Sequence, residues 1–188
     1  MKAELINYVD NWQAVKDAAM NTIGKETGKY PDSAWKKKIL LAEHSPIRLL
    51  IFTIRLTDIP YFCSTHFCRH KIGVEHFVST QRTDRTGIDR DKLPQDALVT
   101  HTMALNAQAL INISRKRLCM QADKTTRQVW NEVLKTFYNL EPELWEVCQH
   151  ECVYRGFCPE MRSCGYCGTA AWRDEREKYL GVSECSNN

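Results

Sequence analysis

The sequence lacks any apolar run approaching the ~20 residues that a membrane-spanning helix needs. Its first residues have neither an apolar core nor a small-residue cleavage site, so no signal peptide is predicted. We therefore expect a cytoplasmic protein with no membrane partner. Repeats and low-complexity tracts are also missing, and 26 Lys and Arg against 23 Asp and Glu give a net charge of only +3. Bulk charge therefore does not predict nucleic-acid binding, and 188 residues suit one domain with a sizeable core.

Cysteine, in contrast, is abundant: the chain has 9, an odd number. Without a secretory signal a disulfide framework is not expected, so free thiols or metal ligands explain them better. Nothing marks Cys63, Cys68 or Cys119 as an activated nucleophile, and cysteine catalysis is accordingly a minor alternative.

Hydrophobic periodicity and breaker residues predict an α+β fold, with helices packed on a small antiparallel sheet. The expected helices cover Tyr8 to Ile23, Asp32 or Ser33 to Ser45, Tyr61 to His70, a long stretch opened by Pro94, and Thr125 to His150. The expected strands cover Ile47 to Thr57 and Val74 to Thr80. The polar segment TDRTGIDRDK is expected to be a loop. Two strands do not make a stable sheet. Either further strands or a subunit of a homo-oligomer must therefore complete it.

The stretch from Cys63 to Arg82, CSTHFCRHKIGVEHFVSTQR, is dense in basic residues and histidines. Read alone, it favours a solvated basic helix end followed by a half-buried strand. Arg117 allows two interpretations. It lies in the basic run RKR, which favours an exposed residue, but it also shares a helix face with Asn106, three turns away, which would suit a site.

Four ordered segments between Glu43 and Val129 resemble the flavin-dependent thymidylate synthases. That family is marked by Arg-His-Arg, seven residues and a serine with an arginine close behind. Here the matching residues are Arg69, His70, Lys71 and Ser79, with lysine replacing the last arginine of the triplet. The other segments are HSPIRLLIFTIRL upstream, Arg90 before Leu93-Pro94, and the asparagine-rich helix with Asn106, Gln108, Asn112 and Arg117.

The resemblance implies a homotetramer that binds FAD between its subunits. Members of the family use NADPH and methylenetetrahydrofolate to methylate dUMP at C5, giving dTMP. Carried over by motif, the cofactor-binding residues are Arg69, His70, Lys71, Asn106, Gln108 and Asn112. The substrate-binding residues are His66, Ser79, Thr80, Gln81, Arg82, Arg90 and Arg117, and Arg117 is also the activating catalytic residue. Planar arginine donors suit a phosphate, and a fixed cation stabilises negative charge on a pyrimidine ring.

The chain also departs from the family pattern. Gln81 stands where the arginine after the serine is usual, with Arg82 one residue further, so either Ser79 or Thr80 faces the phosphate. His66 replaces a substrate-holding glutamine, and Leu49, next to Arg48, replaces a histidine. Only seven residues separate Arg82 from Arg90, where relatives carry a helical insertion. Another pyrimidine nucleotide such as dCMP, or a hydroxymethyl product, is therefore the alternative within the enzyme class.

The last part of the chain is not in the family pattern, and we expect a division into a domain of residues 1–147 and a cysteine-rich tail of residues 148–188. Cys152, Cys158, Cys164 and Cys167 are the expected ligands of zinc or an iron-sulfur cluster, with Cys148 and His150 as substitutes. Buried, reduced cysteines are the alternative. A metal-binding tail beside basic segments also leaves a non-catalytic nucleic-acid-binding module as the hypothesis from a different class.

Overall fold

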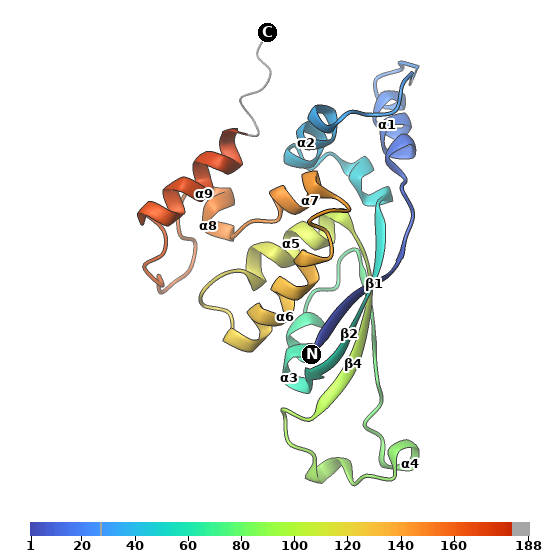
Figure 1. The fold of residues 1–188 in the computed structure, drawn as a ribbon, viewed down its shortest axis with the longest axis vertical. Helices are drawn as coiled ribbons and strands as arrows, with labels where there is room; N and C mark the ends of the chain where they lie inside the picture. The colour runs from blue at the N-terminus through green and yellow to red at the C-terminus, as the bar shows by residue number, and fades with distance from the viewer. Residues whose placement is uncertain (27, 182–188) are drawn as a thin grey trace.

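The computed structural model describes residues 1–26 and 28–181. Its strands are β1 (Lys2–Tyr8), β2 (Ile51–Pro60), β3 (Val74–Val78) and β4 (Leu98–Asn106), and its α-helices are α1 (Trp12–Asn21), α2 (Ser33–Leu41), α3 (Tyr61–Phe67), α4 (Thr83–Thr86), α5 (Ala107–Arg117), α6 (Lys124–Lys135), α7 (Pro142–Val147), α8 (Glu151–Arg155) and α9 (Ala170–Gly181), with 3-10 turns η1 (Ser45–Leu49) and η2 (Arg90–Lys92). The strands form one antiparallel sheet in the order β1-β2-β4-β3. Helices α3, α5 and α6 lie against one of its faces (Figure 1). The predicted α+β class is confirmed.

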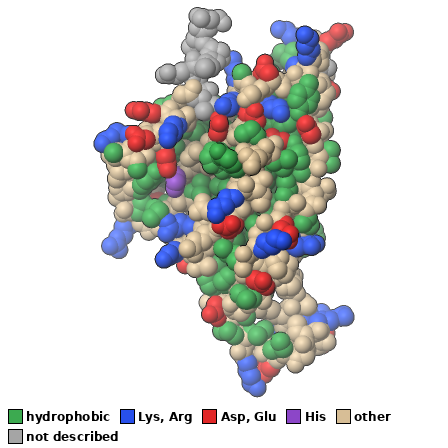
Figure 2. All heavy atoms as spheres, viewed as in Figure 1, with side chains coloured by type: hydrophobic (Ala, Val, Ile, Leu, Met, Phe, Trp, Pro, Cys, Tyr) green, Lys and Arg blue, Asp and Glu red, His purple; other side chains and the backbone are tan. Residues whose placement is uncertain are grey.

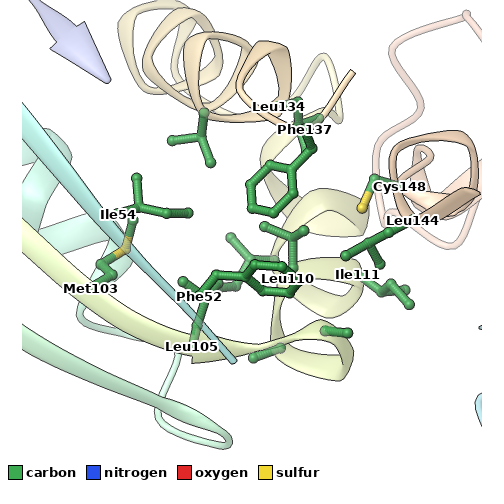
Figure 3. Packing of buried hydrophobic residues seen from close by; sticks show 14 of the residues in the cluster. Phe52, Ile54, Met103, Leu105, Leu110, Ile111, Leu134, Phe137, Leu144 and Cys148 are labelled. Atoms are coloured by element: carbon green, nitrogen blue, oxygen red, sulfur yellow. The ribbon is translucent and has the colours of Figure 1, made fainter. Parts of the chain in front are cut away.

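The core lies between that face of the sheet and the helices. Phe52 and Ile54 of β2 and Met103 of β4 alternate with exposed or half-buried neighbours and point into it. They meet Leu110 of α5 and Phe137, which follows α6 (Figure 3). The phenyl ring of Phe137 meets that of Phe52 edge-on, with ring centroids 4.9 Å apart. This packing fixes the start of α5 relative to the sheet.

Two strands were missed by the sequence analysis, and they complete the sheet within one chain. The predicted long helix from Pro94 is wrong: Leu98–Asn106 alternates buried and exposed residues as β4, and the helix begins only after Asn106. The Asn106 side chain accepts a hydrogen bond from Ala109 N at 2.9 Å, so it caps α5. Similarly, residues up to Tyr8 belong to β1, and the first helix begins at Trp12.

The predicted helix from Thr125 to His150 is interrupted. Helix α6 starts after the capping residue Asp123 and stops at Lys135, and α7 restarts with Pro142 in its first turn. Proline has no N–H for a helix interior, which explains the break. Asp32 does cap the second helix, as predicted, by accepting a hydrogen bond from Trp35 N at 2.8 Å. The strand predicted from Ile47 to Thr57 is wrong in its first part, because Ser45–Leu49 form the turn η1 and β2 begins at Ile51.

In the described part of the chain, no helix is long and apolar enough to cross a membrane. The C-terminal helices pack on the rest through α8, whose Val153 is buried and whose Tyr154 ring lies 3.5 Å from the Arg115 guanidinium carbon of α5. The loop predicted for residues 83–92 is exposed and contains the short turns α4 and η2, beyond one end of the sheet (Figure 1).

Candidate nucleotide and flavin site

Three predicted site residues meet in an arginine–histidine cluster, defined as His66 of α3, His70 just after α3, and Arg117 of α5. The half-buried Arg117, the last residue of α5, donates from Nε to His70 Nε2 at 3.1 Å. It also donates from an Nη group to the His66 carbonyl at 2.6 Å. A guanidinium carries five N–H donors. Among the described residues the other Nη group donates to no protein atom, so this end of the fork is left for a ligand.

His70 accepts from Arg117 because its ring is neutral. Burial, with the charge of Arg117 close by, lowers the pKa of His70 to about 4. The His66 ring is turned toward α6, where its Nδ1 lies 2.8 Å from Thr126 Oγ1. Burial and the cations of Arg117 and Arg69 also lower the pKa of His66. The cluster is therefore one fixed cation held by neutral groups.

Two histidines on the inner face of the sheet support the cluster, and the sequence analysis assigned a role to neither. His76 Nε2 donates to the His70 carbonyl at 2.7 Å, which leaves its Nδ1 to accept from His101 Nε2 at 3.0 Å when the rings are neutral. His101 is fully buried, and its Nδ1 has no hydrogen-bond partner. Burial, with His76 adjacent, lowers the pKa of His101 to about 4.

Together with Cys68, these histidines form a set of ligand atoms within 4.8 Å of one another. Both nitrogens of His76 already serve the hydrogen-bonded chain, and burial raises the pKa of the Cys68 thiol. We therefore interpret the set as a support for the His70 backbone rather than as a metal site. The alternation of VTHTMAL would have placed His101 on the inner face if β4 had been recognised.

Arg69 and Lys71, the other members of the basic triplet, line an open groove of about 390 Å³ beside α3, together with Ser64, Thr65 and Val78. Among the described residues neither Arg69 nor Lys71 forms a salt bridge, in contrast to Arg82. Unpaired cations along a groove suit an anionic ligand, and the unused Nη group of Arg117 suits the edge of a planar polar ring.

The asparagine-rich helix α5 presents the predicted cofactor residues on two sides. Asn106 is at its start, where its backbone N–H donates to the Gly73 carbonyl at 3.0 Å, just after the basic triplet. Gln108 and Asn112 instead lie with Glu43: Gln108 Nε2 donates to the Glu43 carboxylate at 2.5 Å and to Asn112 Oδ1 at 3.4 Å. Successive residues of a helix are rotated by about 100°, which places Gln108 and Asn112 on the side of α5 away from Arg117.

Glu43, which the sequence analysis did not single out, organises this second side of α5. It has a positive φ of 48°, and its carboxylate also pairs with Arg115. Burial raises the pKa of the Glu43 carboxyl, but hydrogen bonds from Arg115 and Gln108 outweigh burial and hold this pKa below its ordinary value. Arg115 also donates to Asn112 Oδ1 at 3.3 Å, which leaves the Asn112 amide N–H groups facing solvent.

The predicted phosphate-binding residues are not brought to the arginine–histidine cluster within the described chain. Thr80 and Arg82 are exposed and Gln81 is half-buried. Arg82 forms hydrogen bonds of 2.8 and 2.9 Å with Asp84. Arg90 is exposed, and its Nε lies 3.7 Å from Asp91 Oδ1. Ser79 Oγ accepts from Thr100 N at 3.1 Å and so extends the β3–β4 pairing.

The predicted metal ligands of the tail do come together, with one addition. Cys152, Cys158, Cys164 and Cys167 line one small cavity, and Cys119 from the turn after α5 lines it too. Burial, followed by the influence of Cys167, Cys119 and Cys158, raises the pKa of Cys152 to about 11. Cys148 is buried elsewhere, in the core.

No protein-family model matches the sequence, and no curated protein matches it by sequence. Solved structures do match its fold. A flavin-dependent thymidylate synthase ThyX from Helicobacter pylori, complexed with FAD and dUMP, has 13% sequence identity and a TM-score of 0.64 and matches over 79% of this chain and 100% of its own. This chain has the fold of the flavin-dependent thymidylate synthases.

A UMP/dUMP methylase PolB from Streptomyces cacaoi, bound with 5-Br dUMP, is a second match, with 15% identity, a TM-score of 0.63 and coverage of 83% of this chain and 95% of its own. Both neighbours are enzymes that bind a uracil nucleotide, as their names state. The family resemblance in the sequence is thereby confirmed at the level of the thymidylate synthase fold, whereas identities this low do not transfer a reaction.

Proposed function

We propose that this protein is an FAD-dependent enzyme that methylates dUMP at C5 to give dTMP, with methylenetetrahydrofolate as carbon donor and NADPH as reductant. The observation that carries the proposal is the arginine–histidine cluster, in which the family-matched residues His70 and Arg117 meet His66, which stands at the family's glutamine position, on a thymidylate synthase fold. Bound FAD would relay the reducing equivalents, while the protein orients and polarises the substrate. A cytoplasmic location is part of the proposal.

Arg117 is the proposed activating residue. Its Nε and one Nη group are fixed by His70 and the His66 carbonyl, so the guanidinium is held before substrate arrives. The free Nη group would donate to the pyrimidine edge, where a preorganised cation stabilises negative charge that develops on the ring. A cation held this way needs no reorganisation during the reaction.

The residues fit a flavin only if two subunits share it. Arg69 and Lys71, on either side of His70 in the sequence, border the groove beside α3, whereas Gln108 and Asn112 lie on the other side of α5. One isoalloxazine ring cannot contact both sets in a single chain, but it can lie between the first set of one subunit and the second set of its partner. We therefore propose that the protein is a homotetramer with FAD at the subunit contacts.

We propose that the phosphate binds to Thr80, Gln81, Arg82 and Arg90 on the exposed segment after β3. The Ser79 hydroxyl is used by Thr100 N, whereas Thr80 Oγ1 lies 3.1 Å from Arg82 N. Thr80 therefore stands beside the arginine, and Ser79 closes the strand. A phosphate would displace Asp84 from Arg82, which is inexpensive because exposed ion pairs contribute little, about 0–1 kcal/mol.

Flavin binding and tritium release test the proposal together. Protein incubated with FAD and passed through a desalting column should keep flavin absorbance, and it should release tritium from C5-labelled dUMP when NADPH and methylenetetrahydrofolate are present. Absence of bound flavin would sink the proposal. Arg117→Lys keeps the charge but loses the fork. It should lower tritium release by about 100-fold or more, while the neighbouring Lys116→Gln, whose ammonium pairs with Glu151, should not.

A second candidate within the same class is the modification of UMP, because one structural neighbour is named a UMP/dUMP methylase. Comparing tritium release from UMP, dUMP and dCMP distinguishes these substrates, and chromatography of the product separates a methyl from a hydroxymethyl group. The nucleic-acid-binding alternative gains little support, because basic and acidic side chains are interspersed on the face shown in Figure 2. Salt-dependent oligonucleotide binding without flavin binding would restore it.

A further inference from the structure

Five cysteines from three separate segments line a single small cavity at the C-terminal end of α5. Cys119 comes from the turn between α5 and α6, Cys152 from α8, and Cys158, Cys164 and Cys167 from the loop before α9. The last four were predicted as metal ligands from the sequence, whereas Cys119 was not. Its place in the cavity arises from the fold, which returns the tail to the end of α5 through the contact of α8 with that helix.

The loop that carries three of these thiols has little else to hold it. From Phe157 to Gly168 no described residue donates a backbone–backbone hydrogen bond. Phe157 and Met161 are 56% and 105% exposed, and Tyr166 is the large side chain of this loop that packs inward, on the His150 ring with centroids 5.3 Å apart. Gln121, two residues after Cys119, donates to the Arg162 carbonyl at 2.9 Å and ties the loop to the α5–α6 turn. A loop of this kind is stabilised when thiolates from its ends and middle bind one metal.

One of the five thiols is more exposed to solvent than the other four. Cys119, Cys152, Cys158 and Cys167 are half-buried, whereas Cys164 is exposed. We propose that Cys119, Cys152, Cys158 and Cys167 are the four thiolate ligands of a metal centre and that Cys164 lies at its rim.

The separation of the sulfurs indicates which centre to expect. Zinc with Zn–S bonds of about 2.3 Å requires tetrahedral sulfurs roughly 3.8 Å apart. Among the described residues, Cys68, His76 and His101 are the one group of three or more ligand atoms that all lie within 4.8 Å of one another, so no three of the cavity thiols are this close together. A cluster with several iron and sulfide atoms between its thiolates holds them further apart than a single ion does. We accordingly expect an iron-sulfur cluster.

Metal and sulfide analysis of the full chain tests the site without reference to enzyme activity. Protein purified without oxygen, and protein reconstituted anaerobically with ferrous iron and sulfide, should contain iron, acid-labile sulfide and a broad visible absorbance. A parallel sample loaded with Zn²⁺ forms the second arm. Zinc bound in place of iron would overturn the cluster assignment, and no metal above background in either arm would overturn the site.

Single variants test the ligand set. Cys119→Ser and Cys158→Ser should each lose most of the bound metal, whereas Cys164→Ser should keep it. Cys148→Ser is a matched control, because this thiol is buried in the core close in sequence to the ligands but outside the cavity. Far-UV circular dichroism confirms that each variant folds. For a variant that does not fold, chelation of the wild-type protein followed by alkylation should expose Cys119 with the tail thiols. Metal retention by folded Cys119→Ser would contradict the proposal, as would protection of Cys119 after chelation.

Discussion

At the residue scale, the buried histidines beside the proposed active site make stability depend on pH. His70 and His101 have folded pKa values of about 4, against an ordinary value of 6.5. Between these values the unfolded chain binds protons that the folded chain does not, so the free energy of unfolding falls as the pH is lowered from 6.5 to 4. His101, which is fully buried between Phe67 and His76, should contribute up to about 1.4 kcal/mol per pH unit.

Urea unfolding at pH 7 and pH 5 measures this effect. His101→Gln should lose less stability than the wild type between the two pH values, whatever its stability at pH 7. His44→Gln, at an exposed histidine, is the control. An equal loss in His101→Gln and the wild type would show that His101 is protonated in the folded protein.

At the scale of elements, the start of α5 is fixed against the turn that follows the basic triplet. Gly73 has a φ of 74°, and a Cβ at this position would lie 2.6 Å from the side-chain nitrogen Nδ2 of Asn106. Asn106 cannot move away freely, because its side chain caps α5. Gly73→Ala should therefore lower the free energy of unfolding by the ~1–2 kcal/mol of a left-handed alanine and by about 1 kcal/mol more for the clash.

Gly87→Ala is the matched control for this prediction, since Gly87 has a φ of 71° with no atom within 4 Å of an added Cβ. The two variants share the conformational cost, so the difference between their unfolding free energies reports the Asn106 contact. Equal costs would mean that this contact does not fix the two segments.

Elements were predictable where local chemistry was unambiguous, as at the Asp32 cap and strand β3. Strand β4 was missed because LVTHTMAL runs without a breaker into the helical pattern of ALINIS, and only the capping role of Asn106 separates them. The members of the arginine–histidine cluster were singled out from the family motifs, which lie in two segments of the sequence. Glu43, His101 and Cys119 were not, because their partners are distant in the sequence and are set by packing.

At the scale of the whole molecule, the sheet has one face without helices in the described part of the chain. Ile51, Phe77 and Leu98 on this outer face are 58%, 62% and 64% exposed. Exposed apolar groups on a sheet face favour contact with another subunit. Phe77→Lys should therefore shift the proposed tetramer to smaller species in light scattering and lower flavin retention, with an unchanged circular dichroism spectrum.

Ile23→Lys, at an apolar residue with 60% exposure after α1 and away from the sheet, is the control and should not change the assembly. If Phe77→Lys remains fully assembled, the outer face of the sheet is not the subunit contact.

The two-sided arrangement of α5 has a genetic consequence. A site built from the Arg117 side of one subunit and the Asn112 side of another can be damaged in either half by separate mutations. Two genes that each encode an inactive chain, one with Arg117→Lys and one with Asn112→Ala, should then complement each other when they are coexpressed. Mixed oligomers would contain some sites with both halves intact, whereas a single gene carrying both changes could not be rescued by either one.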